Sequence, residues 1–119
     1  MPRKRKKTGY ARNAARAEDD RLQHRLAAAK EALERIRQGE APTAEELAAA
    51  PMLQFWCIVL DGPLPLFQGV VTGLPRIPDG HLIGTSPIIW VAPDETAART
   101  VSRWYRLGVP LTAAVPKLH

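Results

Sequence analysis

The chain has 119 residues, of which 45% are hydrophobic and 24% are charged, and its formal net charge is +5. This composition is typical of one small globular domain with an appendage, and it excludes both a disordered chain and two full-sized domains. No apolar run approaches the roughly 18 residues of a membrane-spanning helix. No lipid-inserting aromatic residue accompanies the N-terminal cations, so no membrane partner is expected.

The positive charge is concentrated at the start of the chain. Residues 1–16 contain no acidic residue and seven basic ones: Arg3, Lys4, Arg5, Lys6, Lys7, Arg12 and Arg16. The other 103 residues carry 10 basic and 12 acidic side chains. Because a run of like charges without a hydrophobic pattern is typical of unfolded segments, we expect residues 1–12 to be a disordered basic tail on a nearly neutral protein.

The sequence also indicates a cellular compartment. The basic start is followed by Ala, Arg and acidic residues rather than by the apolar core of a signal peptide. The single cysteine, Cys57, lies in the apolar stretch 55–60, where a thiol packs as a small hydrophobic group. One cysteine excludes both an internal disulfide and a cysteine zinc site, so we expect a cytoplasmic protein.

Residues 13–51 are predicted to be helical. Apolar residues recur at helical spacing and form a stripe on one face: Ala15, Leu22, Leu26, Ala29, Leu33 and Ile36. From Leu22 to Ile36 the stripe spans only about 80°, which is the width of a coiled-coil seam. Gly39 and Pro42 end this first helix. Thr43 and Glu46 form a capping box that begins a second helix over 44–50, which Pro51 ends.

Residues 52–119 are predicted to be a small β-domain. Apolar and β-branched runs separated by Gly and Pro turns predict strands over 53–60, 66–72, 81–85 and 88–92, with a possible bulge at Gly69. Residues 98–107 alternate with a period of two and are read as a fifth strand, although a helix over 95–105 remains the alternative. The predicted fold class is α+β, with the helices followed by a small antiparallel sheet or partly open barrel.

Four stretches of the β-domain together carry a resemblance to a known family: Gln68–Gly73, Pro75–Gly80, Ile83–Ser86 and Ala98–Gly108. Over roughly residues 66–110 this pattern resembles a family of small uncharacterised bacterial proteins, a domain of unknown function seen mainly in alphaproteobacteria such as rhizobia. The loop of that family usually reads Gly-His-Pro, whereas here it reads Gly73-Leu74-Pro75, so any role of that histidine is absent. The resemblance implies a bacterial cytoplasmic setting and brings no established activity.

Catalytic and metal sites receive little support. Asp79, His81 and Ser86 are of the types that form a hydrolase triad, but their spacing specifies no such geometry and turn chemistry explains Asp79 better. The three histidines are far apart and lack partners at ligand spacing. No glycine-rich loop precedes a helix in the manner of a nucleotide site. We therefore expect no catalytic residue, no metal and no cofactor.

Two features favour a binding function. The N-terminal cations suit a sequence-independent contact with the phosphates of DNA or RNA, although a merely solubilising tail would look the same. Arginines next to an aromatic residue in the last predicted strand would add phosphate contacts and base stacking, unless they serve the core: Arg99, Arg103, Trp104 and Arg106.

The sequence therefore predicts a non-enzymatic accessory or regulatory protein that associates with nucleic acid. The alternative is a protein-interaction module, which would use a sheet edge or self-associate or bind a partner through its helical seam at Leu22, Leu26, Leu33 and Ile36.

Overall fold

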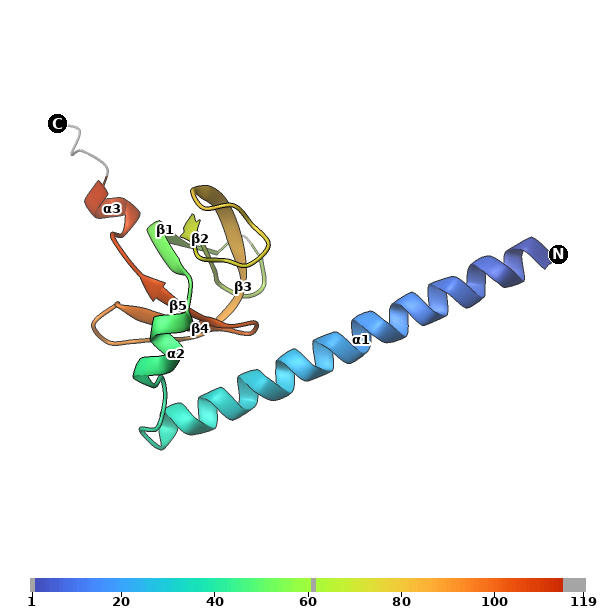
Figure 1. Cartoon of the computed structure of the whole chain (residues 1–119), viewed down its shortest axis with the longest axis horizontal. Coiled ribbons are helices and arrows are strands. Elements are labelled where there is room, and N and C mark those ends of the chain that lie inside the picture. Colours follow the sequence, from blue (N-terminus) through green and yellow to red (C-terminus); the bar gives the residue numbers. More distant parts are fainter. Residues whose placement is uncertain (1, 61, 115–119) are drawn as a thin grey trace.

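The structure is a computed structural model that describes the backbone of residues 2–60 and 62–114 and the side chains of residues 13–60 and 62–112. A long helix and a short helix precede a five-stranded β-barrel, and one helical turn follows it (Figure 1). In chain order the elements are α1 (Pro2–Arg37), α2 (Ala44–Ala49), β1 (Met52–Val59), β2 (Leu66–Thr72), β3 (His81–Val91), β4 (Ala97–Thr100), β5 (Trp104–Leu107) and α3 (Leu111–Ala114). The protein is therefore α+β, as the sequence predicts.

Helix α1 is longer than the sequence pattern indicates. We expected residues 1–12 to be a disordered tail, but α1 begins at Pro2, so this segment is helical from Pro2 onward. Two local properties favour this start. Proline is well suited to the first helical position, where its missing N–H has no helical partner, and the Lys, Arg and Ala residues that follow are strong helix formers. The expectation of disorder rested on the repulsion between like charges and took no account of these helix propensities.

Only the C-terminal end of α1 packs on the rest of the protein. Residues 13–28 are all exposed, and the first buried side chains are those of Ala29 and Ala32. Ala32 joins a small cluster with Trp104 and Ala50, against which Ile36 also packs. The remainder of α1 extends away from the barrel (Figure 1).

The connection from α1 to the barrel follows local sequence rules. Gly39 has a φ of 75°, a left-handed conformation that favours glycine and that ends α1. The Ala41–Pro42 peptide bond is cis. The predicted capping box of α2 is confirmed: the Glu46 amide donates to Thr43 Oγ1, and the Thr43 amide donates to Glu46 Oε1.

The five strands form a closed barrel in the order β1-β2-β3-β4-β5. The four sequential pairs are antiparallel, whereas β1 and β5 pair in parallel through Met52 with Arg106 and Leu53 with Leu107. The expected antiparallel sheet or partly open barrel is thus replaced by a closed barrel with one parallel pair. The reason is geometric, because the first and last strands of a five-strand meander run in the same direction.

Two predicted strand boundaries differ from the structure. The predicted strands 81–85 and 88–92 are a single strand, β3, that continues through Pro87 opposite Leu66 at a shift in register. The single predicted strand over 98–107, and also its helical alternative, is replaced by a hairpin, β4 and β5, with a turn over residues 101–103. Period-two alternation does not show where a strand reverses direction.

The barrel core is apolar and small. Leu53, Phe67, Val71 and Ala98 are completely buried, and Trp56 meets the ring of Phe67 edge-on at a centroid distance of 5.6 Å. The bulge expected near Gly69 lies on the opposite strand, β1, where the register shifts between Gln54 and Cys57. Phe55, within that shift, has a φ of 53°, which is unusual for a bulky residue.

Candidate functional site

The N-terminal cations lie in the first turns of α1. Seven residues of this segment are predicted to contact nucleic acid, and one of them, Arg16, is exposed. The side chains of the other six lie outside the described part of the structure: Arg3, Lys4, Arg5, Lys6, Lys7 and Arg12. Helix α1 as a whole carries 12 basic and 5 acidic residues, so it holds the excess positive charge of the chain. The cations are thus placed on an arm that projects from the barrel (Figure 1).

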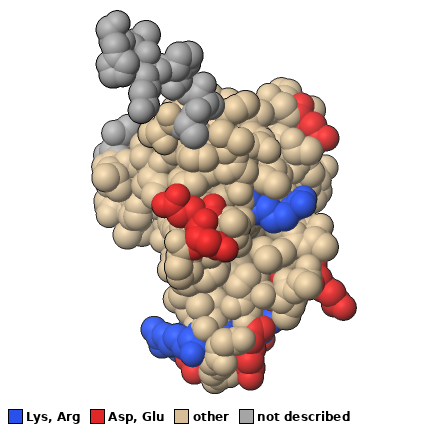
Figure 2. Space-filling model, turned by 90° about the vertical axis from the view of Figure 1, so that its left-hand side faces the viewer, with Lys and Arg blue, Asp and Glu red and all other residues tan. Residues whose placement is uncertain are grey.

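The barrel has a different surface. Figure 2 shows the side of the molecule from which α1 points away, and its coloured atoms form separate red and blue groups rather than one basic surface. Beyond α1, the described cations are Arg76, Arg99, Arg103 and Arg106. This face of the barrel therefore shows no large basic surface among the described residues.

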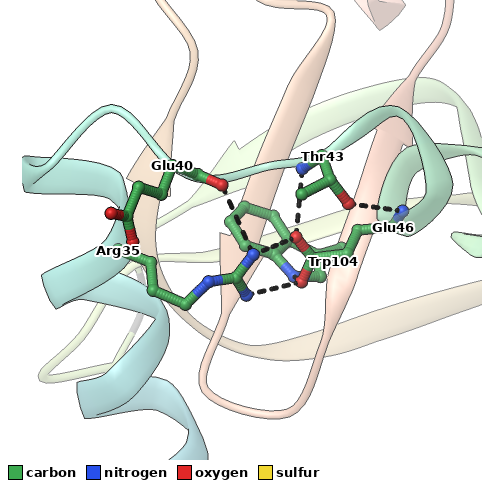
Figure 3. A network of polar contacts seen from close by, with 5 residues as sticks. All are labelled: Arg35, Glu40, Thr43, Glu46 and Trp104. Carbon is green, nitrogen blue, oxygen red and sulfur yellow. Dashed lines mark hydrogen bonds and ion pairs between the residues drawn. The ribbon is translucent and has the colours of Figure 1, made fainter.

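A polar network joins α1 to the barrel through Glu46 (Figure 3). Arg35 donates two hydrogen bonds to the Glu46 carboxylate, from Nη2 to Oε1 at 2.7 Å and from Nη1 to Oε2 at 2.9 Å. The indole Nε1–H of Trp104 donates to Oε2 at 3.0 Å, and the Thr43 amide donates to Oε1 at 3.0 Å. The Arg35 hydrogen bonds hold the pKa of Glu46 at about 2, and the bonds from Thr43 add to this effect. Glu46 thus ties together α1, α2 and β5.

Trp104 and Arg99 serve the core. Trp104 is 7% exposed and Arg99 is 8% exposed. The Arg99 guanidinium lies 5.3 Å from the centre of the Trp104 ring, and the ring of Trp90 meets Trp104 edge-on at 6.0 Å. Burial lowers the pKa of Arg99, whose Nε donates to the Thr100 carbonyl. Trp104 is thus mostly buried between Arg99 and Trp90, and its predicted role in base stacking stays a prediction.

Arg106 and Arg103 occupy different environments. Arg106 is half-buried and donates from Nε to the Ala50 carbonyl at 3.1 Å, so it fastens β5 to the end of α2. Arg103 lies in the β4–β5 turn and lines a depression of ≈ 280 Å³ together with Glu46 and Trp104. Of the predicted arginine–aromatic group, Arg103 and Trp104 border this depression.

A second depression, of ≈ 420 Å³, brings Arg103 next to a residue that the sequence analysis did not select. It is lined by Arg103, Arg76 and the apolar residues Leu74, Pro75 and Ile77. Arg76 belongs to the proline-rich loop between β2 and β3, 27 positions before Arg103. No rule of sequence spacing relates Arg76 to Arg103. The sequence signal for Arg76 is that it is the single cation of a proline-rich loop.

The hydrolase-like trio does not form a triad. Asp79 Oδ1 accepts a hydrogen bond from the Gly73 amide at 2.8 Å, and Ser86 Oγ accepts one from the Ser102 amide at 3.1 Å. Among the described residues, no hydrogen bond connects either of them to His81, which is exposed. Asp79 and Ser86 therefore fix a loop and a turn.

The described residues also show neither a cluster of metal ligands nor a membrane-spanning helix. No group of three or more His, Cys, Asp and Glu side chains is placed to hold a metal ion. No helix within residues 2–60 and 62–114 is both long and apolar enough to cross a membrane.

The predicted helical seam is divided between two environments. Leu33 and Ile36 are half-buried where α1 meets the barrel. Leu22 and Leu26 are 43% and 44% exposed. Only the N-terminal part of the seam is thus open to a partner.

Residues 14–118 match a family described as a family of unknown function, DUF6634. The chain belongs to this family. The match extends well beyond the 66–110 resemblance and includes α2, all five strands and most of α1. Of the seven N-terminal cations, only Arg16 lies within it. No curated protein matches the chain, and no solved structure matches it.

Proposed function

We propose that this member of the DUF6634 family is a non-enzymatic accessory protein that associates with nucleic acid through the basic N-terminal part of α1. The observation that carries the proposal is the position of the cations. Seven basic residues, with no acidic residue among them, lie within the first 16 positions of a helix that projects from the barrel.

The physical basis is the release of counterions. Each lysine or arginine that neutralises a phosphate releases condensed cations, so affinity falls steeply as salt increases. Contacts of this kind carry no sequence information. Trp104 and Arg99 are mostly buried, so the proposal assigns the affinity to the phosphate contacts of α1, and the binding is expected to be independent of sequence.

The test is a fluorescence-anisotropy titration of labelled duplex DNA and single-stranded RNA at two salt concentrations. We expect the full chain to bind at low salt, with a logarithmic salt slope of magnitude up to about 6 if all seven cations contact duplex phosphates. A chain that starts at Ala17 should lose most of this affinity. Equal binding by both chains, or no binding by the full chain at low salt, would refute the proposal.

A matched variant separates charge from helix length. Changing Arg3, Lys4, Arg5, Lys6 and Lys7 to Gln keeps the length of α1 and the helix propensity nearly unchanged while removing five charges. We expect this variant to lose most of the affinity, though less than the shortened chain does, because Arg12 and Arg16 remain. If it binds like the full chain, the attraction does not come from these cations.

A second candidate is a protein-interaction module, which the exposure of Leu22 and Leu26 supports. These leucines continue the seam whose C-terminal end packs on the barrel, and two apolar side chains on a solvated helix favour a helical partner or a second copy. The sheet-edge version has less support, because each described strand has neighbours on both sides. Light scattering at tens of micromolar tests self-association: a dimer that Leu22→Ser with Leu26→Ser dissociates would support it, and a monomer would count against it.

A further inference from the structure

The depression between the β2–β3 loop and the β4–β5 turn has the properties of a small binding site. Its volume of ≈ 420 Å³ falls within the range of small-molecule sites. Leu74, Pro75 and Ile77 give it an apolar wall, and Arg76 and Arg103 give it two cations from different segments of the chain.

Neither guanidinium is neutralised within the described part of the chain. The ion pairs there join Arg35 to Glu46 and Arg37 to Glu34. Arg76 is exposed and Arg103 is half-buried. Arg76 and Arg103 both line this hollow, and an anion bound between two cations offsets their mutual repulsion, so the site favours a ligand that carries close to two negative charges.

The turn that carries Arg103 is held in place by the strands beside it. The Arg103 amide donates to Thr100 Oγ1, and its carbonyl accepts from the Thr100 amide at 2.9 Å. The preceding turn residues are bonded to β3: Val101 donates its amide to the Pro87 carbonyl, and Ser102 donates to Ser86 Oγ. Thr100 is fully buried, so the backbone below Arg103 is fixed before any ligand arrives.

The loop that carries Arg76 is fixed in the same way. Its first residue, Gly73, donates its amide to Asp79 Oδ1, and Gly80 donates to the Val71 carbonyl at 2.8 Å. Both glycines have a φ of 88°, which an L side chain rarely adopts. Leu74 and Ile77 pack against the barrel core, so the same residues that form the apolar wall also hold the loop to the barrel.

We propose that this hollow binds the phosphate group of a small phosphate monoester. Arg76 and Arg103 would hold the phosphate, and the organic part of the molecule would lie on Leu74, Pro75 and Ile77. A phosphate monoester carries between about 1.5 and 2 negative charges at pH 7, which matches two guanidinium groups better than a carboxylate does. Planar guanidinium groups also bind phosphate oxygens in pairs.

This site is independent of the nucleic-acid proposal. It lies on the barrel and involves none of the N-terminal cations. A chain that starts at Ala17 should therefore bind a phosphate monoester as well as the full chain does, even if it no longer binds nucleic acid.

The experiment is isothermal titration of the full chain with adenosine 5′-monophosphate, inorganic phosphate and adenosine at constant ionic strength. We expect saturable binding of the monophosphate, weaker binding of phosphate and none of adenosine. Arg76→Gln and Arg103→Gln should each lower the affinity for the monophosphate by about tenfold or more, because each variant removes one of two charge-assisted contacts. Arg25→Gln, an exposed α1 variant with the same loss of charge, should bind normally.

Several results would overturn the proposal. One is the absence of saturable binding of the monophosphate, and another is an affinity for adenosine equal to that for the monophosphate. A third is a loss of affinity in the Arg25→Gln control as large as in the Arg76 and Arg103 variants. Loss of monophosphate binding in the chain that starts at Ala17 would also overturn it, because the N-terminal cations would then be the site. Arg76→Gln keeps the test decisive if Arg103→Gln unfolds, since Arg76 is an exposed loop residue and its side chain makes no hydrogen bond to the described part of the protein.

Discussion

Glu46 shows how one side chain can serve both its own helix and the tertiary structure. Its carboxylate closes the capping box of α2, which the Thr43-x-x-Glu46 spacing predicts. The same two oxygens also accept hydrogen bonds from Arg35 and Trp104, which lie 11 and 58 positions away. The sequence pattern found the first role and gave no sign of the second.

At this scale we predict that Glu46→Gln destabilises the protein by roughly 1–2 kcal/mol. The variant loses a charge-assisted pair with Arg35, and the partial exposure of both side chains keeps the loss moderate. Thermal or denaturant unfolding measures it. Glu45→Gln, which changes an exposed neighbour on α2, is the control and should stay within about 0.5 kcal/mol of the parent. Equal stability of the two variants would contradict the role given to Glu46.

The stabilising effect of Glu46 also has a defined pH dependence. Folding lowers the pKa of this carboxyl from 4.5 to about 2, so the folded state favours the ionised form. Its contribution is therefore complete above about pH 4.5 and is lost as the pH falls towards 2. The difference in unfolding free energy between the parent and Glu46→Gln should shrink over this range. A difference that stayed constant from pH 7 to pH 3 would show that the carboxylate charge is not the cause.

At the scale of elements, α1 is one helix in two environments. Ala29 and Ala32 are buried against the barrel side of the molecule, whereas residues 13–28 have no buried side chain. A helix without tertiary packing depends on its own hydrogen bonds and propensities, which are marginal in water. We expect the amides of residues 13–28 to exchange with deuterium faster than those of residues 29–37. Uniform protection along α1 in an NMR exchange experiment would indicate a partner on the exposed part.

The contact between β1 and β2 leads to a prediction about Gly69. A Cβ added there would lie 3.2 Å from the Gln54 carbonyl oxygen and 3.3 Å from the Trp56 Cα, both of which are backbone atoms. Gly69→Ala should therefore destabilise the barrel by roughly 1–2 kcal/mol. Gly84→Ala is the matched control in β3, where the added Cβ would make only an ordinary contact with Leu66 at 3.8 Å. Denaturant unfolding of both variants provides the comparison.

At the scale of the whole molecule, the projecting helix determines the dimensions. The Cα radius of gyration is 17.9 Å, whereas a compact chain of this length has about 13.5 Å. A helix of 36 residues is about 54 Å long, so most of α1 extends beyond a small barrel. The excess positive charge is thus held at a distance from a nearly neutral domain, which is a favourable arrangement for a polyanion contact.

Small-angle X-ray scattering tests this shape. The full chain should give a radius of gyration near the structural value, allowing for hydration, and the chain that starts at Ala17 should give one several Å smaller, closer to the compact value. The melting temperature should change little, because the removed residues precede the first buried side chain of α1. An unchanged radius would mean that the first 16 residues fold back on the barrel.

Features that depend on neighbouring residues could be predicted before the fold was known. These are the helical period of α1, the end of α1 at Gly39, the capping box of α2, the β character of the second half and the location of the positive charge. Each follows from propensity, periodicity or turn chemistry within a few positions. Other features emerge only from the folded chain: the closed barrel, the reversal at residues 101–103, the burial of Trp104 and Arg99, and the depression that Arg76 and Arg103 both line. The physical reason is that these features depend on contacts between distant segments, which no local pattern of residues encodes.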